Sequence, residues 1–182
     1  CNSDPRLKKL LDNEELQLIT YTDRYIQNPV SMMLLAEVLS SFTDNNGAEI
    51  IVNTSFDEKK SSSSGFAINH DWIDENDYLS IFNDWLNLVC NRTIFLDIRE
   101  KRDIPHRRSL EFSFKSGSKA IITLDQGFGY WKLRLQKGLH NFDFTRSSFA
   151  QTSRLHDVYK SADVYNSADW ETWLTVSVNS KV

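Results

Sequence analysis

The first hundred residues alternate between short β-rich runs and longer amphipathic segments, and this alternation constrains the fold more than any other feature. Strands are expected at residues 16–22, 48–54 and 92–100, and helices at 5–16, 30–42 and 74–89. A helix between consecutive strands is the usual connection of a parallel sheet. This half of the chain therefore predicts a parallel βαβαβ unit behind a short first helix.

The second half carries a different pattern, in which apolar and polar residues alternate on both sides of a Ser-Gly-Ser turn. Residues 108–115 and 119–125 predict a β-hairpin around that turn. Further strands are expected at 130–135 and 140–146, a helix or a strand at 167–178, and a surface loop at 55–66. The predicted fold class is α/β, with a mixed sheet of parallel strands first and antiparallel hairpins later, flanked by helices.

The composition suits one globular domain spanning residues 1–182, with 40% hydrophobic and 25% charged residues. The formal net charge of −4 excludes a protein that binds polyanions by bulk charge, so any anion site must be a local patch. Two cysteines, Cys1 and Cys90, are too few for a disulfide framework and suit a reducing, cytoplasmic compartment. The start at Cys1 without methionine leads us to expect a piece of a longer protein.

Residues 99–119 form a basic segment inside this acidic chain, with seven Lys or Arg against three Asp or Glu and a local charge of +4. At its centre stands His106-Arg107-Arg108, directly before the first hairpin strand. His106 could also be an ordinary surface histidine at a strand entrance. Clustered cations on an acidic protein indicate an anion-binding patch. A lipid head group, a nucleic-acid backbone and an acidic protein segment all fit such a patch.

Four short motifs follow one another between about residues 15 and 160, at spacings that match a known family. They are Asp23-Arg24-Tyr25-Ile26, His106-Arg107-Arg108, Gly117 in the hairpin turn, and Gly127-Phe128-Gly129-Tyr130. In this order they resemble the phospholipase D-like domain at the C-terminus of microtubule-interacting-and-trafficking (MIT) domain proteins, with its prokaryotic relatives. The resemblance implies a phospholipase D-like fold.

The wider phospholipase D superfamily uses His-x-Lys-x4-Asp, in which histidine attacks phosphorus and lysine binds the phosphate oxygens. In this register His106 holds the nucleophile position, Arg108 replaces the lysine and Ser113 replaces the aspartate. Arginine can still bind phosphate, whereas the missing acid weakens the case for catalysis. If the protein is active, the resemblance implies that His106 is the catalytic residue. It implies phosphate ligands Arg108, Arg107 and Lys119, and supporting residues Asp23, Tyr25, Asp125 and Gly127. It implies neither a metal nor a cofactor.

The expected function is a catalytically diverged phospholipase D-like module that binds an anionic, phosphate-bearing partner, either a phospholipid head group or nucleic acid. The resemblance implies a homodimer, at a membrane surface or beside other domains of the parent protein. The alternatives are a dimeric, metal-independent phosphodiesterase or nuclease that uses His106, and an assembly domain in a microbial nucleic-acid-processing or defence system. Whether the protein is an enzyme stays open, with the degenerate motif arguing against it.

Two His-Asp neighbour pairs, His70-Asp71 and His156-Asp157, could suggest a metal site or a catalytic dyad. Sequence neighbours on a strand point to opposite faces, so neither pair predicts one.

Overall fold

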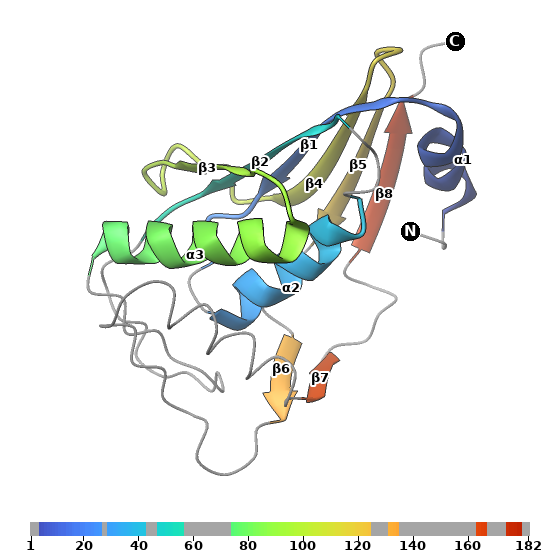
Figure 1. Ribbon diagram of the computed structural model, residues 1–182. Coiled ribbons are helices and arrows are strands. Elements are labelled where there is room, and N and C mark those ends of the chain that lie inside the picture. The colour runs from blue at the N-terminus through green and yellow to red at the C-terminus, as the bar shows by residue number, and fades with distance from the viewer. Residues whose placement is uncertain are drawn as a thin grey trace.

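The computed structural model describes residues 4–26, 29–42, 47–56, 74–124, 131–134, 163–166 and 174–179. These residues form three helices and eight strands (Figure 1). The helices are α1 (Pro5–Asn13), α2 (Pro29–Ser40) and α3 (Glu75–Cys90). The strands are β1 (Leu16–Thr22), β2 (Glu49–Thr54), β3 (Phe95–Ile98), β4 (Arg108–Phe114), β5 (Lys119–Leu124), β6 (Trp131–Arg134), β7 (Asp163–Asn166) and β8 (Leu174–Asn179).

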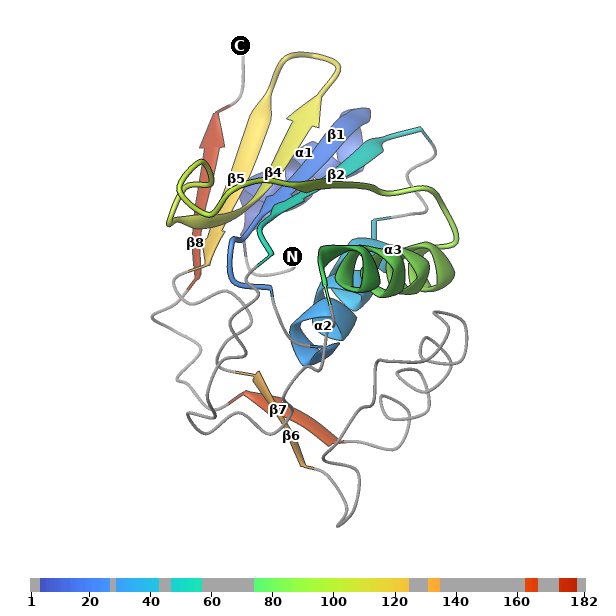
Figure 2. The ribbon, with the colours of Figure 1, turned by 90° about the vertical axis from the view of Figure 1, so that its left-hand side faces the viewer.

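Six of these strands form one mixed sheet in the order β3-β2-β1-β4-β5-β8. The pairs β1–β2 and β2–β3 are parallel, whereas β1–β4, β4–β5 and β5–β8 are antiparallel. The expected parallel first half and antiparallel second half are therefore both present. β6 and β7 form a separate two-stranded antiparallel ribbon, next to α2 and away from the main sheet (Figure 2).

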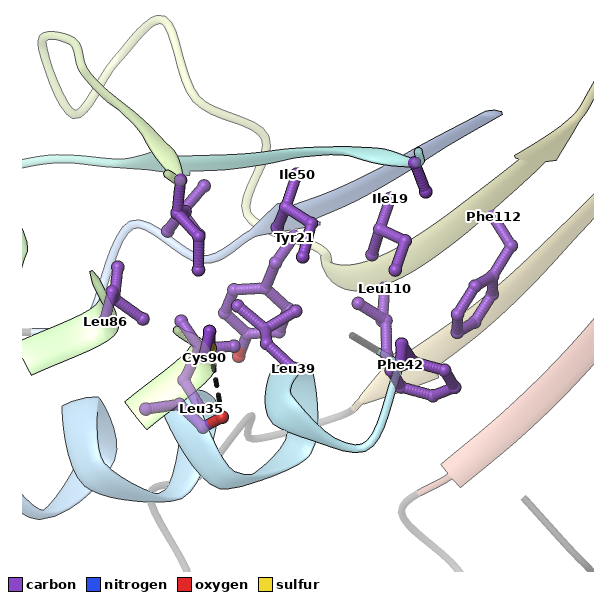
Figure 3. Close-up of a cluster of buried hydrophobic side chains, with 14 of the residues drawn as sticks. Ile19, Tyr21, Leu35, Leu39, Phe42, Ile50, Leu86, Cys90, Leu110 and Phe112 are labelled. Carbon is purple, nitrogen blue, oxygen red and sulfur yellow. Dashed lines mark hydrogen bonds between the residues drawn. The ribbon is translucent and has the colours of Figure 1, made fainter. Parts of the chain in front are cut away.

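Helices α2 and α3 lie side by side against one face of the sheet, which gives a two-layer domain (Figures 1 and 2). Every second residue of the central strands points toward them, because side chains alternate across a strand. The resulting core joins Ile19, Tyr21, Ile50, Val52, Leu110 and Phe112 to Leu35, Leu39, Phe42, Leu86 and Cys90 (Figure 3). Leu7 and Leu10 of α1 complete this core at the end where β1 begins.

The opposite face of the sheet, which we call the open face, carries mostly polar side chains and none of the three described helices. Register places Thr20 beside Glu111 and Thr22 beside Ser109 on the pair β1–β4. Asn53 of β2 lies beside Thr22. These side chains alternate with the buried residues of the same strands, so the polar residues of each strand lie on the face away from the core.

The ends of the helices follow from their capping residues. The carboxylate of Asp4 accepts hydrogen bonds from the backbone N–H groups of Arg6 and Leu7 at the start of α1. Asp74 accepts one from the N–H of Asp77 at 2.9 Å and starts α3. Asn91 ends α3 in the left-handed conformation, with φ of 50°.

Most elements lie where the sequence pattern predicts them. β3 covers only Phe95–Ile98 of the expected 92–100, and β7 was not predicted. The ambiguous tail contains strand β8, which pairs with β5 at the edge of the sheet. The expected strand 140–146 and most of the expected loop 55–66 lie outside the described residues.

Candidate functional site

The sheet topology brings the ends of β1, β2, β3 and β5 and the starts of β4 and β8 to the same edge. β1, β2 and β3 run in parallel and end there, and β4 starts there because it is antiparallel to β1. Backbone bonds extend this edge, from the N–H of Asp23 to the carbonyl of Asn53 and from the N–H of Arg99 to that of Thr54, both at 3.0 Å. The carboxyl ends of parallel strands are a common location for ligand sites in open α/β sheets.

Asp23, the first residue after β1, is buried at this edge beside Arg108, the first residue of β4. The Nε of Arg108 donates to Oδ1 of Asp23 at 3.3 Å, and the two side chains are only 10% and 4% exposed. Asp23 also accepts from the hydroxyl of Tyr21 at 3.1 Å and from the N–H of Tyr25 at 2.8 Å. Burial raises the pKa of Asp23, and these hydrogen bonds together with the Arg108 cation oppose that rise.

Tyr25 is surrounded by cationic side chains. The guanidinium of Arg108 lies 4.5 Å from the ring centroid, and Arg24 and the ammonium of Lys101 lie at 5.1 and 5.0 Å. The imidazole of His106 approaches the same ring edge-on at 5.5 Å. The ring therefore organises a group of cations from three separate segments.

Arg24 is held at this edge by neutral oxygen atoms. Its Nη2 donates to the hydroxyl of Tyr25 at 2.9 Å and its Nη1 to the carbonyl of Lys101 at 3.3 Å. Its Nε is buried and has no hydrogen-bond partner among the residues that the structure describes. The hydroxyl of Ser55, just after β2, fixes the turn by donating to the carbonyl of Arg24 at 2.8 Å. Among the described residues the Arg24 guanidinium is therefore bonded to neutral oxygens, and its Nε is closed to solvent.

The basic segment 99–119 is far less positive in space than in sequence. Four of its seven cations lie next to carboxylates: Arg99 with Asp97, Arg102 with Glu100 and Asp103, Arg108 with Asp23, and Lys115 with Glu15. Arg107 instead donates to the hydroxyl of Thr123, a neutral partner. The guanidinium groups that bond neutral oxygens are those of Arg24 and Arg107, and these two carry the charge that we consider for binding an anion.

The structure brings some of the predicted site residues together and separates others. Asp23, Tyr25, His106 and Arg108 form one contact group, in which His106 is exposed and Arg108 is buried. Lys119 starts β5 at the opposite edge, about 17 Å along the strand from the residue that pairs with Arg108. Asp125 and Gly127 lie outside the described residues. Within the described ranges no cluster of three potential metal ligands occurs.

A polar pocket on the open face was missed by sequence reasoning. Its volume is about 350 Å³, and it lies between the sheet and the β3–β4 loop, residues 99–107. Its floor holds Thr20, Thr22, Asn53, Ser109 and Glu111, and its wall holds Arg99, Asp103, Ile104, Pro105 and Arg107. The alternating polar positions of β1, β2 and β4 are the signal in the sequence that could have indicated it.

Together the fold and this edge define a two-layer α/β domain with one open sheet face and a group of cations at the strand ends. The model of the family "DEAD/DEAH box helicase YjiV, C-terminal domain" matches residues 1–178, so the chain belongs to that family. A search of curated proteins found no match.

The family match shows that the phospholipase D-like resemblance was wrong, and with it the kinship to MIT-domain proteins. The expected phospholipase D-like module for lipid or phosphate is therefore wrong. The alternative that acts on nucleic acid is only loosely compatible with the family. The structure supplies a physical reason. Arg108, read as a phosphate ligand, is buried against Asp23, and the motif match relied on short segments whose surroundings the sequence does not reveal.

None of the described helices is long and apolar enough to cross a membrane.

Proposed function

We propose that this chain is an accessory domain of a DEAD/DEAH-box helicase that contacts the single-stranded nucleic acid handled by the motor. Family membership supports a role beside a helicase motor, and the cation group at the strand ends suits contact with a sugar-phosphate backbone. The observation that carries the proposal is Arg24, whose guanidinium bonds only neutral oxygens among the described residues. The other domains of the parent helicase are the protein partner that we propose.

The contact residues are Arg24 and Arg107, and Arg108 is not one of them. Arg108 serves this surface indirectly, since its ion pair with Asp23 holds the turn that carries Arg24 and Tyr25. Tyr25 is a positioning residue, because its ring is in contact with cations and is not free to stack with a base.

Binding of short, labelled single-stranded oligonucleotides, followed by fluorescence anisotropy over a salt series, tests the proposal. The double variant Arg24→Ala/Arg107→Ala should weaken binding roughly tenfold, because two charge-assisted contacts are lost. The slope of log affinity against log salt should decrease by roughly 1.4, at about 0.7 for each phosphate contact on a single strand.

The matched control removes the same charge from the other end of the domain. Lys8 and Lys9 are exposed on α1, which precedes β1, so Lys8→Ala/Lys9→Ala should keep the wild-type affinity and salt slope. Equal behaviour of the two double variants would mean that the strand-end cations are not the contact surface. Absence of binding by the wild-type chain would refute the proposal altogether.

A further inference from the structure

The floor of the polar pocket offers hydrogen-bond acceptors. Asn53 uses its Nδ2 to donate to the hydroxyl of Thr22 at 3.3 Å, while its Oδ1 is buried without a partner among the described residues. The Oε1 of Glu111 accepts from the hydroxyl of Ser109 at 3.0 Å, and its carboxylate has a second oxygen with which to accept. A buried carbonyl oxygen without a partner costs free energy, so a ligand with N–H donors would be stabilised on this floor.

The wall of the same pocket offers the opposite chemistry. Arg107 lies there beside the short apolar stretch of Ile104 and Pro105, whereas the charge of Arg99 is paired with Asp97 and Asp103 adds a carboxylate to the wall. The ligand that fits carries amino or imino donors at one end, a flat apolar body, and a negative group at the other. A nucleotide has this combination, and about 350 Å³ is near the lower end of small-molecule pockets, which suits one nucleotide.

We propose that this pocket binds one nucleotide of a single strand and prefers bases that carry an exocyclic amino group, namely cytosine and adenine over uracil. The inference rests on the proposed function and adds base selectivity to it. Carboxylates accept from the amino group of cytosine and side-chain amides pair with adenine. Uracil has a single imino N–H flanked by two carbonyl oxygens, so at least one carbonyl would face the acceptors Asn53 Oδ1 and Glu111, which lowers its affinity relative to cytosine and adenine.

Phe95 provides a second, separate observation on the same face. It is 55% exposed, and it stands two residues before Asp97, which pairs with Asn53 in the sheet. A nucleotide in the pocket would place its neighbour along the strand near this ring. Stacking of a base on an exposed aromatic ring strengthens binding whatever the base is, so Phe95 would contribute affinity and the pocket floor selectivity.

The test compares labelled oligo-C, oligo-A and oligo-U with the wild-type chain and the variant Glu111→Gln. Wild type should bind oligo-C and oligo-A roughly fivefold or more tightly than oligo-U. Glu111→Gln replaces an acceptor by an amide that can donate to uracil, so this ratio should decrease toward one. Glu49→Gln makes the same chemical change at the other end of the open face and should leave the ratio unchanged.

Two further experiments test the stacking contact and whether the pocket binds a free nucleotide or one within a strand. Phe95→Ala should weaken all three oligomers by a similar factor, whereas Leu88→Ala, at a side chain of similar exposure on α3, should not. Cytidine monophosphate should compete far more weakly than oligo-C, and equal competition would assign the pocket to a free nucleotide and overturn the strand contact.

The results distinguish this inference from the proposed function. If the oligomers bind with a salt dependence that Arg24→Ala/Arg107→Ala reduces, but without base preference, the nucleotide pocket is refuted and the proposed function stands. If no oligomer binds, both are refuted.

Discussion

Replacing Arg108 with alanine removes the cation from a buried carboxylate, and the cost of doing so measures whether this residue is structural. Asp23 and Arg108 are 4% and 10% exposed, so water cannot readily replace the lost partner. Breaking a buried ion pair by removing one member typically costs about 3–5 kcal/mol. Asp23 keeps its hydrogen bonds from Tyr21 and Tyr25, which places Arg108→Ala near 3 kcal/mol within that range.

Urea unfolding, followed by tryptophan fluorescence and circular dichroism, measures this free energy of unfolding. The matched control is Arg99→Ala, whose partner Asp97 forms an ion pair with both side chains about half exposed, and it should cost less than about 1 kcal/mol. In the double variant Asp23→Asn/Arg108→Ala the buried charge is gone. Its loss should be smaller than the sum of the two single losses by about 2 kcal/mol.

The pH dependence gives a second, independent readout on the same variant. Burial raises the pKa of Asp23, and removing Arg108 raises it further, so the folded variant holds this proton at a pH where the unfolded chain has released it. Stability due to such a group decreases as pH rises. The deficit of Arg108→Ala should therefore be smallest near pH 4 and grow toward pH 7, relative to wild type. A deficit below about 1 kcal/mol at neutral pH would refute the structural role of Arg108.

Three further outcomes follow from the core and the helix ends. Phe112→Ala should lower the free energy of unfolding, measured in urea titrations, by about 3–5 kcal/mol. The reason is that the Phe112 ring is fully buried and packs edge-to-face on Phe42, with the ring centroids 5.0 Å apart. A loss under about 1 kcal/mol would contradict this packing. Burial raises the pKa of the Cys90 thiol to about 11 from 9.0, so the unfolded chain ionises first. Wild type should therefore lose about 2 kcal/mol relative to Cys90→Ala between pH 8 and 11, and parallel pH profiles would exclude this. Asp74→Ala should lower the free energy of unfolding by about 1 kcal/mol, because the hydrogen bond that caps the N–H of Asp77 is lost. Thermal unfolding measures this loss, and Asp74→Asn should retain most of the stability because asparagine can also cap a helix.

Local pattern was sufficient to predict most elements because it depends on neighbours in the sequence. The β-rich run 16–22 reproduces the bounds of β1, and burial has a period of two from Ile19 onward, after the register shift between Leu16 and Leu18. The N-cap at Asp74 and the apolar stripe behind it likewise define α3. β3 was predicted too long at both ends, because residues 92–94 precede the paired strand and residues 99 and 100 are exposed and lie between the strand and the turn at 101–103.

The candidate site was less predictable, because it depends on which strands become neighbours. No local pattern indicates that β4 pairs with β1, and that pairing alone buries Arg108 against Asp23, 85 residues away. Counting charges along 99–119 also missed carboxylates that come from elsewhere, such as Glu15, which pairs with Lys115. An arginine that looks like a free ligand in a sequence can be the partner of a distant acid.

The central position of β1 in the sheet has a consequence for synthesis on the ribosome. One edge of β1 pairs with β2, which follows soon after it, but the other edge waits for β4, and 85 residues separate Asp23 from Arg108. At roughly 5–20 residues per second, the waiting edge stays open for about 4–17 s. During that interval β1 offers unpaired backbone groups to any strand that arrives first, including one from a neighbouring nascent chain. The speed of translation across α3 and β3 should therefore influence how much of the protein reaches its native sheet.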